Sequence, residues 1–160
     1  MPTNTNDAGA DQRLKELGII LPRPPTPLGA YVEAVQSGSL LFLSGTLPVE
    51  GGVPKFVGCI GGDLSVDDGR RATRLAALNA LALVKQHLGS LDRVRRVVRL
   101  AVSLVTTPEF REHAKVADAA SELLVSVFGA DKTSTRMVVG VASLPVGVSV
   151  VVETIYDIGE

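Results

Sequence analysis

The segment Thr133–Ile158, "TSTRMVVGVASLPVGVSVVVETIYDI", decides the fold of this chain. It predicts two strands, Arg136–Ala142 and Val148–Ile158, which are joined by the turn-forming residues 143–147. Both strands are apolar at odd and even positions, whereas a strand with one solvated face alternates between apolar and polar residues. We therefore expect both faces of these strands to be covered.

A charged residue stands near each end of this apolar run. Arg136 precedes it and Glu153 lies close to its end, with no charge from Met137 to Val152. The residues alone leave two interpretations of Arg136 open. Its guanidinium either reaches solvent or pairs with an acid such as Glu153, or it binds the carboxylate of a ligand through two parallel hydrogen bonds.

The rest of the chain predicts a mixed sheet and two long helices. Ser65 and Gly89 are typical first and last signals of one helix, and Pro108 and Gly129 bracket the other. The order β-β-(β)-α-β-α-β-β indicates one α/β (α+β) domain with both helices packed on one face of the sheet. The second face then needs another subunit, so the sequence predicts an oligomer. The other expected strands are Tyr31–Gln36 and Leu40–Leu43 with a turn at Ser37-Gly38, a short strand near Lys55–Val57, and Val97–Val105.

The chain divides into a tail, an extension and a main domain. Residues 1–10 are polar and are expected to form a flexible tail. Residues 11–29 predict a short helix followed by a proline-rich arm, and residues 30–160 form the main domain. We expect the arm to lie over the domain, and a mobile segment is the alternative.

The composition excludes several classes of function. A net charge of −1 provides no broad basic field for nucleic acid or anionic lipid. The single cysteine, Cys59, and two histidines on separate segments, His87 and His113, do not form a metal-ligand pattern, and the glycines form no phosphate-binding loop. No apolar run approaches the roughly 20 residues that span a bilayer, and residues 1–10 lack the features of a signal peptide. We expect a cytoplasmic protein that uses neither metal nor cofactor.

Two stretches of the chain resemble the reactive-intermediate deaminase family, also called RidA or YjgF-like. They are "GAYVEAVQSGSLLFLSGTLPV" at residues 29–49 and "TRMVVGVASLPVGVSVVVETI" at residues 135–155. The leader "RLKELGIILPRPPTPLG" is similar to a branch of the family that has an N-terminal extension. The resemblance implies a chorismate-mutase-like fold and a homotrimer with three clefts between subunits.

The same resemblance implies a reaction and a set of site residues. Active family members hydrolyse 2-imino acids, or their enamine tautomers, to 2-keto acids and ammonia. Arg136 aligns with the family arginine that holds the substrate carboxylate. Tyr31 and Ser44 match a tyrosine and a serine of the family, and both can donate hydrogen bonds to a ligand, as can Thr46 beside them.

Four positions depart from the pattern of the active deaminases. Thr46 replaces a glutamine, Asp118 an asparagine and Val138 a cysteine. Val151 replaces the glutamate that is thought to handle the attacking water, and valine accepts no proton. Glu153 or Asp118 is then the candidate substitute, although Asp118 beside Arg136 would also occupy the guanidinium and weaken carboxylate binding.

Three functions therefore remain as hypotheses. The first is imine or enamine hydrolysis in a homotrimer, slowed by Val151, and the second is non-catalytic binding of small carboxylates in the same cleft. The third, an endoribonuclease or translation inhibitor, is disfavoured by the net charge of −1 and by few aromatic residues for base stacking. The four arginines of residues 93–99 are better explained as a solvated edge.

Overall fold

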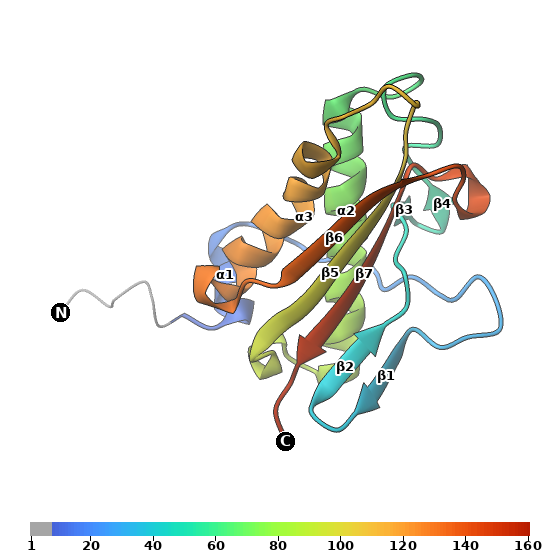
Figure 1. Cartoon of the computed structure of the whole chain (residues 1–160). Helices are drawn as coiled ribbons and strands as arrows, with labels where there is room; N and C mark the ends of the chain where they lie inside the picture. Colours follow the sequence, from blue (N-terminus) through green and yellow to red (C-terminus); the bar gives the residue numbers. More distant parts are fainter. Residues whose placement is uncertain (1–7) are drawn as a thin grey trace.

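The computed structural model describes residues 8–160, which fold into a five-stranded sheet with helices on one face (Figure 1). The strands of this sheet follow the order β1-β2-β7-β5-β6, and β3 and β4 form a separate hairpin. The helices are α1 (Ala10–Glu16), α2 (Val66–Leu88) and α3 (His113–Phe128). The strands are β1 (Ala34–Ser37), β2 (Leu40–Leu43), β3 (Val49–Glu50), β4 (Val53–Pro54), β5 (Arg96–Val105), β6 (Thr135–Val141) and β7 (Val150–Asp157).

The pairing of β5 with β6 gives the sheet its mixed character. These two strands are parallel, while β1 with β2, β2 with β7 and β5 with β7 are antiparallel. Parallel neighbours need a crossover connection, which α3 supplies between β5 and β6. The two long helices, α2 and α3, lie side by side against the same face of the sheet (Figure 1). The mixed sheet with two long helices on one face is thus confirmed.

Local signals at both ends fix the position of α2. The Ser65 side chain accepts a hydrogen bond from the backbone N–H of Asp68, and the Asp68 carboxylate accepts one from the backbone N–H of Ser65. This reciprocal capping box satisfies two N–H groups that would otherwise lack partners. Gly89 ends the helix with φ of 84°, a left-handed conformation that glycine adopts without a steric penalty.

Successive residues of β7 face the helices and the open side of the sheet in turn. Val150, Val152, Thr154 and Tyr156 are buried beneath the helices, and the intervening residues are partly or fully exposed. In the single subunit the prediction of two covered faces therefore holds for one face alone. The open face is largely apolar, and its residues include Phe42, Ala101, Met137, Val151 and Ile155.

The structure corrects several of the predicted elements. The second long helix begins at His113 rather than Pro108, because Pro108 and Glu109 form a turn in which the Phe110 N–H donates to the Thr107 carbonyl. No strand forms at Lys55–Val57, since Phe56 takes a left-handed φ of 53° that interrupts an extended chain.

The chain instead makes the β3–β4 hairpin a few residues earlier. Its two-residue loop is Gly51-Gly52, with φ values of 57° and 78°, and such tight hairpin turns favour a positive φ at both positions. The first strand also begins later than expected, at Ala34, and its turn is Gly38-Ser39.

The N-terminal extension packs on the main domain through α1. The Asp11 carboxylate accepts hydrogen bonds from Ser90 Oγ at 2.6 Å and from Lys85 Nζ at 3.3 Å. In return, the backbone N–H of Asp11 donates to Asp92 Oδ1 at 3.1 Å. Residues 1–7 of the expected tail lie outside the described part of the chain, and Ala10 already belongs to α1. Within residues 8–160, no helix is both long and apolar enough to span a bilayer.

Candidate functional site

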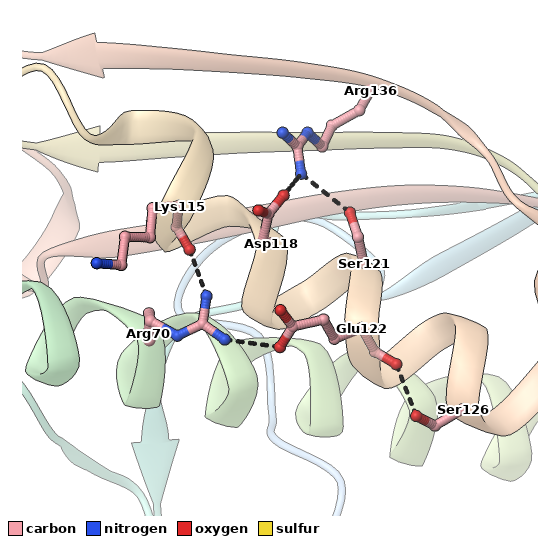
Figure 2. A network of polar contacts seen from close by, with 7 residues as sticks. All are labelled: Arg70, Lys115, Asp118, Ser121, Glu122, Ser126 and Arg136. Carbon is pink, nitrogen blue, oxygen red and sulfur yellow. Dashed lines mark hydrogen bonds and ion pairs between the residues drawn. The ribbon is translucent and has the colours of Figure 1, made fainter.

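Arg136 lies on β6, the outer strand at one edge of the sheet. It is in register with the buried Leu100 of β5, so its side chain leaves the sheet on the side that the helices cover. There its Nη1 donates to Asp118 Oδ1 at 2.6 Å and to Ser121 Oγ at 3.2 Å, both on α3 (Figure 2). Arg136 thus pairs with Asp118 and not with Glu153.

Both of these contacts use one nitrogen of the guanidinium (Figure 2). Among residues 8–160, neither Nη2 nor Nε of Arg136 has a hydrogen-bond partner, and the side chain keeps 26% of its surface exposed. A guanidinium binds a carboxylate through two parallel N–H groups. Asp118 and Ser121 therefore orient Arg136 and leave the Nη2–Nε edge available to a ligand carboxylate.

A second arginine in the same region has partners at both of its terminal nitrogens. Arg70 of α2 donates to Glu122 Oε2 at 2.6 Å and to the backbone carbonyl of Lys115 (Figure 2). Its side chain is 27% exposed, nearly the same as that of Arg136. Because its contacts connect α2 to α3 through both terminal nitrogens, Arg70 has a structural role.

Tyr31 and Ser44 lie at the opposite edge of the sheet, next to β1 and β2. The Ser44 hydroxyl donates to the Val32 carbonyl at 2.6 Å, and the Tyr31 hydroxyl oxygen accepts from the backbone N–H of Leu28 at 3.0 Å. Both residues line a cavity of about 380 Å³. The Tyr31 phenol keeps its own proton available as a donor.

The two groups of residues are too far apart to hold one small ligand within a subunit. The outer strands β1 and β6 are separated by the three strands β2, β7 and β5. Four inter-strand spacings of about 4.8 Å place these edges roughly 19 Å apart. A site that combines Arg136 with Tyr31 and Ser44 consequently needs two subunits.

The hydroxyl of Thr46 is directed into the protein, where it is used within the subunit. The residue is 3% exposed, and its Oγ1 lies 2.9 Å from the Ala76 carbonyl oxygen and 3.1 Å from that of Val152. A threonine suits this position because its hydroxyl satisfies buried carbonyl groups of α2 and β7. Thr46 lines the same cavity as Tyr31 and Ser44, and its contact with substrate stays a prediction.

Val151 and Glu153 share the open face of β7. Glu153 is exposed and lies in register with Ala101, whereas Val151 packs against Gly45. A Cβ atom built on Gly45 would lie 2.8 Å from Val151 Cγ1, so this contact requires a glycine. At the position where a water-handling carboxylate is expected, the site therefore presents a methyl group.

The comparisons with known proteins agree with this architecture. Residues 11–157 match the profile of the family described as "YjgF/chorismate mutase-like, putative endoribonuclease". The chain belongs to the RidA/YjgF family. A curated relative, Protein TCP17 from Trypanosoma cruzi, is 40% identical over 146 residues, which cover 91% of each chain.

Two solved structures extend the comparison with RidA/YjgF proteins. One, from Shewanella oneidensis, carries the same endoribonuclease description and is 33% identical, with a TM-score of 0.90 over 94% of this chain and 99% of its own. The other is TdcF from Escherichia coli with bound serine, 25% identical, with a TM-score of 0.60 over 84% of this chain and 93% of its own.

Sequence reasoning missed two parts of this candidate site. Ser121 was not foreseen, although it lies three residues after Asp118 on α3 and therefore shares its helix face. The contribution of the proline-rich arm to the cavity beside Tyr31 was also missed, because an extended segment carries no periodic signal that says where it packs.

Proposed function

We propose that this protein is a homotrimer that binds 2-imino acids between its subunits and hydrolyses them to 2-keto acids and ammonia. The observation that carries the proposal is the free Nη2–Nε edge of Arg136 on one outer strand. Serine, the ligand of the related TdcF structure, also has a carboxylate and a nitrogen on the adjacent carbon.

Two features support the assembly of such a site from two subunits. Arg136 and the Tyr31–Ser44 pair lie at opposite edges of the sheet. If the β6 edge of one subunit docks beside the β1 edge of the next, Arg136 of the first subunit comes close to Tyr31 and Ser44 of the second. The open face of the sheet carries exposed apolar side chains, among them Met137 at 53% and Phe42 at 39%. Burying these side chains between subunits would stabilise the trimer.

In the proposed reaction Arg136 holds the carboxylate and leaves C2 of the imine open to water. The water oxygen bonds to C2 of the protonated imine while the C=N π pair moves to the nitrogen, and a proton passes from that water to a base. The base returns this proton to the nitrogen of the resulting carbinolamine. The hydroxyl group then loses its proton to the base as the carbonyl forms, and the C–N bond breaks so that ammonia leaves with the bonding pair. Enamine substrates first take up a proton at C3. Orientation by Arg136, Tyr31 and Ser44 supplies the proximity that speeds this addition.

The site has no carboxylate at the position where the family has its water-handling glutamate. Val151 cannot accept a proton, and Glu153 lies two residues further along the strand, roughly 7 Å away. The Asp118 carboxylate is already paired with Arg136 at 2.6 Å. We therefore propose slow hydrolysis, with Glu153 as the leading candidate base and Asp118 as the alternative.

A second candidate function is non-catalytic binding of small carboxylates in the same cleft. Val151 favours this function, because a valine in place of the family's glutamate supplies no base while the binding residues are retained. The endoribonuclease description of the relatives is not extended to this chain, because a net charge of −1 gives little attraction for RNA.

The binding step is tested with Arg136→Ala, and Arg70→Ala serves as a control of similar exposure and charge. Loss of a bidentate, charge-assisted contact should weaken pyruvate and 2-oxobutanoate binding by about 2–4 kcal/mol, or roughly 30- to 1000-fold. Isothermal titration calorimetry measures the affinity, and sedimentation equilibrium verifies that the assembly is retained. Equal binding by wild type and Arg136→Ala would leave Arg136 with a structural role alone.

A further inference from the structure

The N-terminal extension forms one wall of the cavity beside Tyr31. Residues 23–28 of the proline-rich arm line it, together with residues 44–47 after β2, the β3–β4 hairpin and Leu83 of α2. We call this cavity of about 380 Å³ the arm chamber. Its volume falls within the range of roughly 300–1,000 Å³ that small-molecule sites occupy.

The walls of the arm chamber are mostly apolar. Three prolines of the arm contribute to it, together with the side chains of Leu28, Leu47, Val49 and Leu83. Its two charged residues, Arg23 and Glu33, have opposite signs, so the chamber favours neither an acidic nor a basic group on balance. Such a surface suits an uncharged, apolar part of a ligand.

The arm chamber adjoins the residues that are proposed to handle the substrate. Tyr31 and Ser44 belong to its wall, and so does Gly45, against which Val151 packs. A substrate whose reacting carbon lies beside Tyr31 and Val151 would therefore have its side chain directed at the chamber. A ligand as small as pyruvate would leave most of the 380 Å³ unfilled.

From this arrangement we infer that the arm chamber receives the substrate side chain and selects 2-imino acids with branched or aromatic apolar side chains. The inference rests on the proposed function, because it assumes that the carboxylate binds at the same cleft. It also assigns a role to the extension: the arm supplies the outer wall of a specificity pocket.

The size of the preference follows from the apolar surface that the chamber buries. Each buried CH₂ group increases affinity about fourfold. The side chain of 4-methyl-2-oxopentanoate has three more carbons than that of pyruvate, which sets an upper limit of about 60-fold. With incomplete burial, we expect wild type to bind 4-methyl-2-oxopentanoate at least about tenfold more tightly than pyruvate.

The test compares pyruvate, 4-methyl-2-oxopentanoate and 2-oxoglutarate by calorimetry on the full-length protein. Val49→Phe fills the chamber from β3, and Val53→Phe places the same side chain on the paired strand β4, outside the chamber. Val49→Phe should lower the affinity for 4-methyl-2-oxopentanoate about tenfold more than it lowers the affinity for pyruvate. Val53→Phe should change neither affinity.

The outcomes separate the inference from the proposed function. If pyruvate binds through Arg136 but the larger keto acid gains nothing, the chamber inference is wrong and the proposed function stands. A preference for 2-oxoglutarate would also overturn it and would assign Arg23 to a second carboxylate. If the larger keto acid binds in a Val49-dependent way that Arg136→Ala does not weaken, the chamber stands and the carboxylate anchor fails. Absence of binding by all three acids overturns both. The affinity order of wild type decides the question even where Val49→Phe fails to fold.

Discussion

Replacing Asp118 by asparagine should tighten the binding of small carboxylates. The Asp118 carboxylate lies 2.6 Å from Nη1 of Arg136, and a ligand carboxylate on the Nη2–Nε edge would lie on the other side of the same guanidinium. Asp118 therefore orients the arginine and at the same time repels the ligand. The amide of asparagine keeps an oxygen that accepts the Nη1 hydrogen bond but carries no charge.

The magnitude follows from the separation of the two negative charges. At roughly 6 Å and an effective dielectric constant of about 20, they repel by about 3 kcal/mol. The Asp118 side chain is 49% exposed, so solvent and salt reduce this to about 1 kcal/mol. Asp118→Asn should therefore bind pyruvate about fivefold more tightly, and the gain should shrink as the salt concentration rises.

The assay is calorimetric titration of pyruvate into wild type, Asp118→Asn and Glu122→Gln. Glu122 lies one turn further along α3 and pairs with Arg70, so its replacement removes the same charge without freeing Arg136. A similar gain in both variants would indicate a general effect of net charge. Weaker binding by Asp118→Asn would refute the reasoning, since it would mean that the charge of Asp118 is needed to hold Arg136 in place.

Three further predictions concern catalysis, acid stability and assembly. Val151→Glu should raise imine hydrolysis by up to about 10²–10⁴-fold, with Val151→Gln as the uncharged control; the test generates 2-iminobutyrate with an amino-acid oxidase and follows keto-acid release against semicarbazide trapping. Burial raises the pKa of Asp11, but hydrogen bonds from Ser90 and Lys85 outweigh it and leave the pKa below 3.8. Asp11 therefore stabilises the fold above about pH 4, and this contribution is lost as the pH falls from there through the lower pKa of the folded state. Asp11→Asn should therefore flatten the fall in melting temperature that calorimetry records on acidification. Sedimentation equilibrium at micromolar concentration should give a mass near three times the 16.7 kDa subunit, and a stable monomer would contradict the proposed assembly.

Local chemistry explains which parts of the fold could be predicted from the sequence. Ser65 and Gly89 determine the ends of α2 through groups that lie within one turn of the chain, so short-range patterns suffice. The start of α3 was missed because Pro108 is also a good turn residue, and the buried Phe110 favours the turn here. The hairpin at Gly51-Gly52 was overlooked because its strands have only two residues each.

In the candidate site, too, short-range sequence patterns do not determine contacts between distant elements. The pairing of Arg136 with Asp118 was anticipated as a risk to ligand binding, and the two side chains do meet. Whether one or two guanidinium nitrogens are occupied depends on the distance between β6 and α3, which no sequence pattern encodes. The inward orientation of Thr46 depends in the same way on how closely α2 approaches β2.

Arg136 and Tyr31 lie at opposite edges of the sheet, so in the proposed assembly each site would take residues from two chains. In the proposed trimer, a subunit lacking Arg136 still offers an intact tyrosine edge, and a subunit altered at Tyr31 still offers an intact arginine edge. When two such inactive proteins are unfolded, mixed in equal amounts and refolded together, three quarters of the trimers would contain both kinds of chain. Each mixed ring would regain one of its three sites, or about a quarter of all sites in the sample. Two inactive mutant copies of this protein in one cell would complement each other.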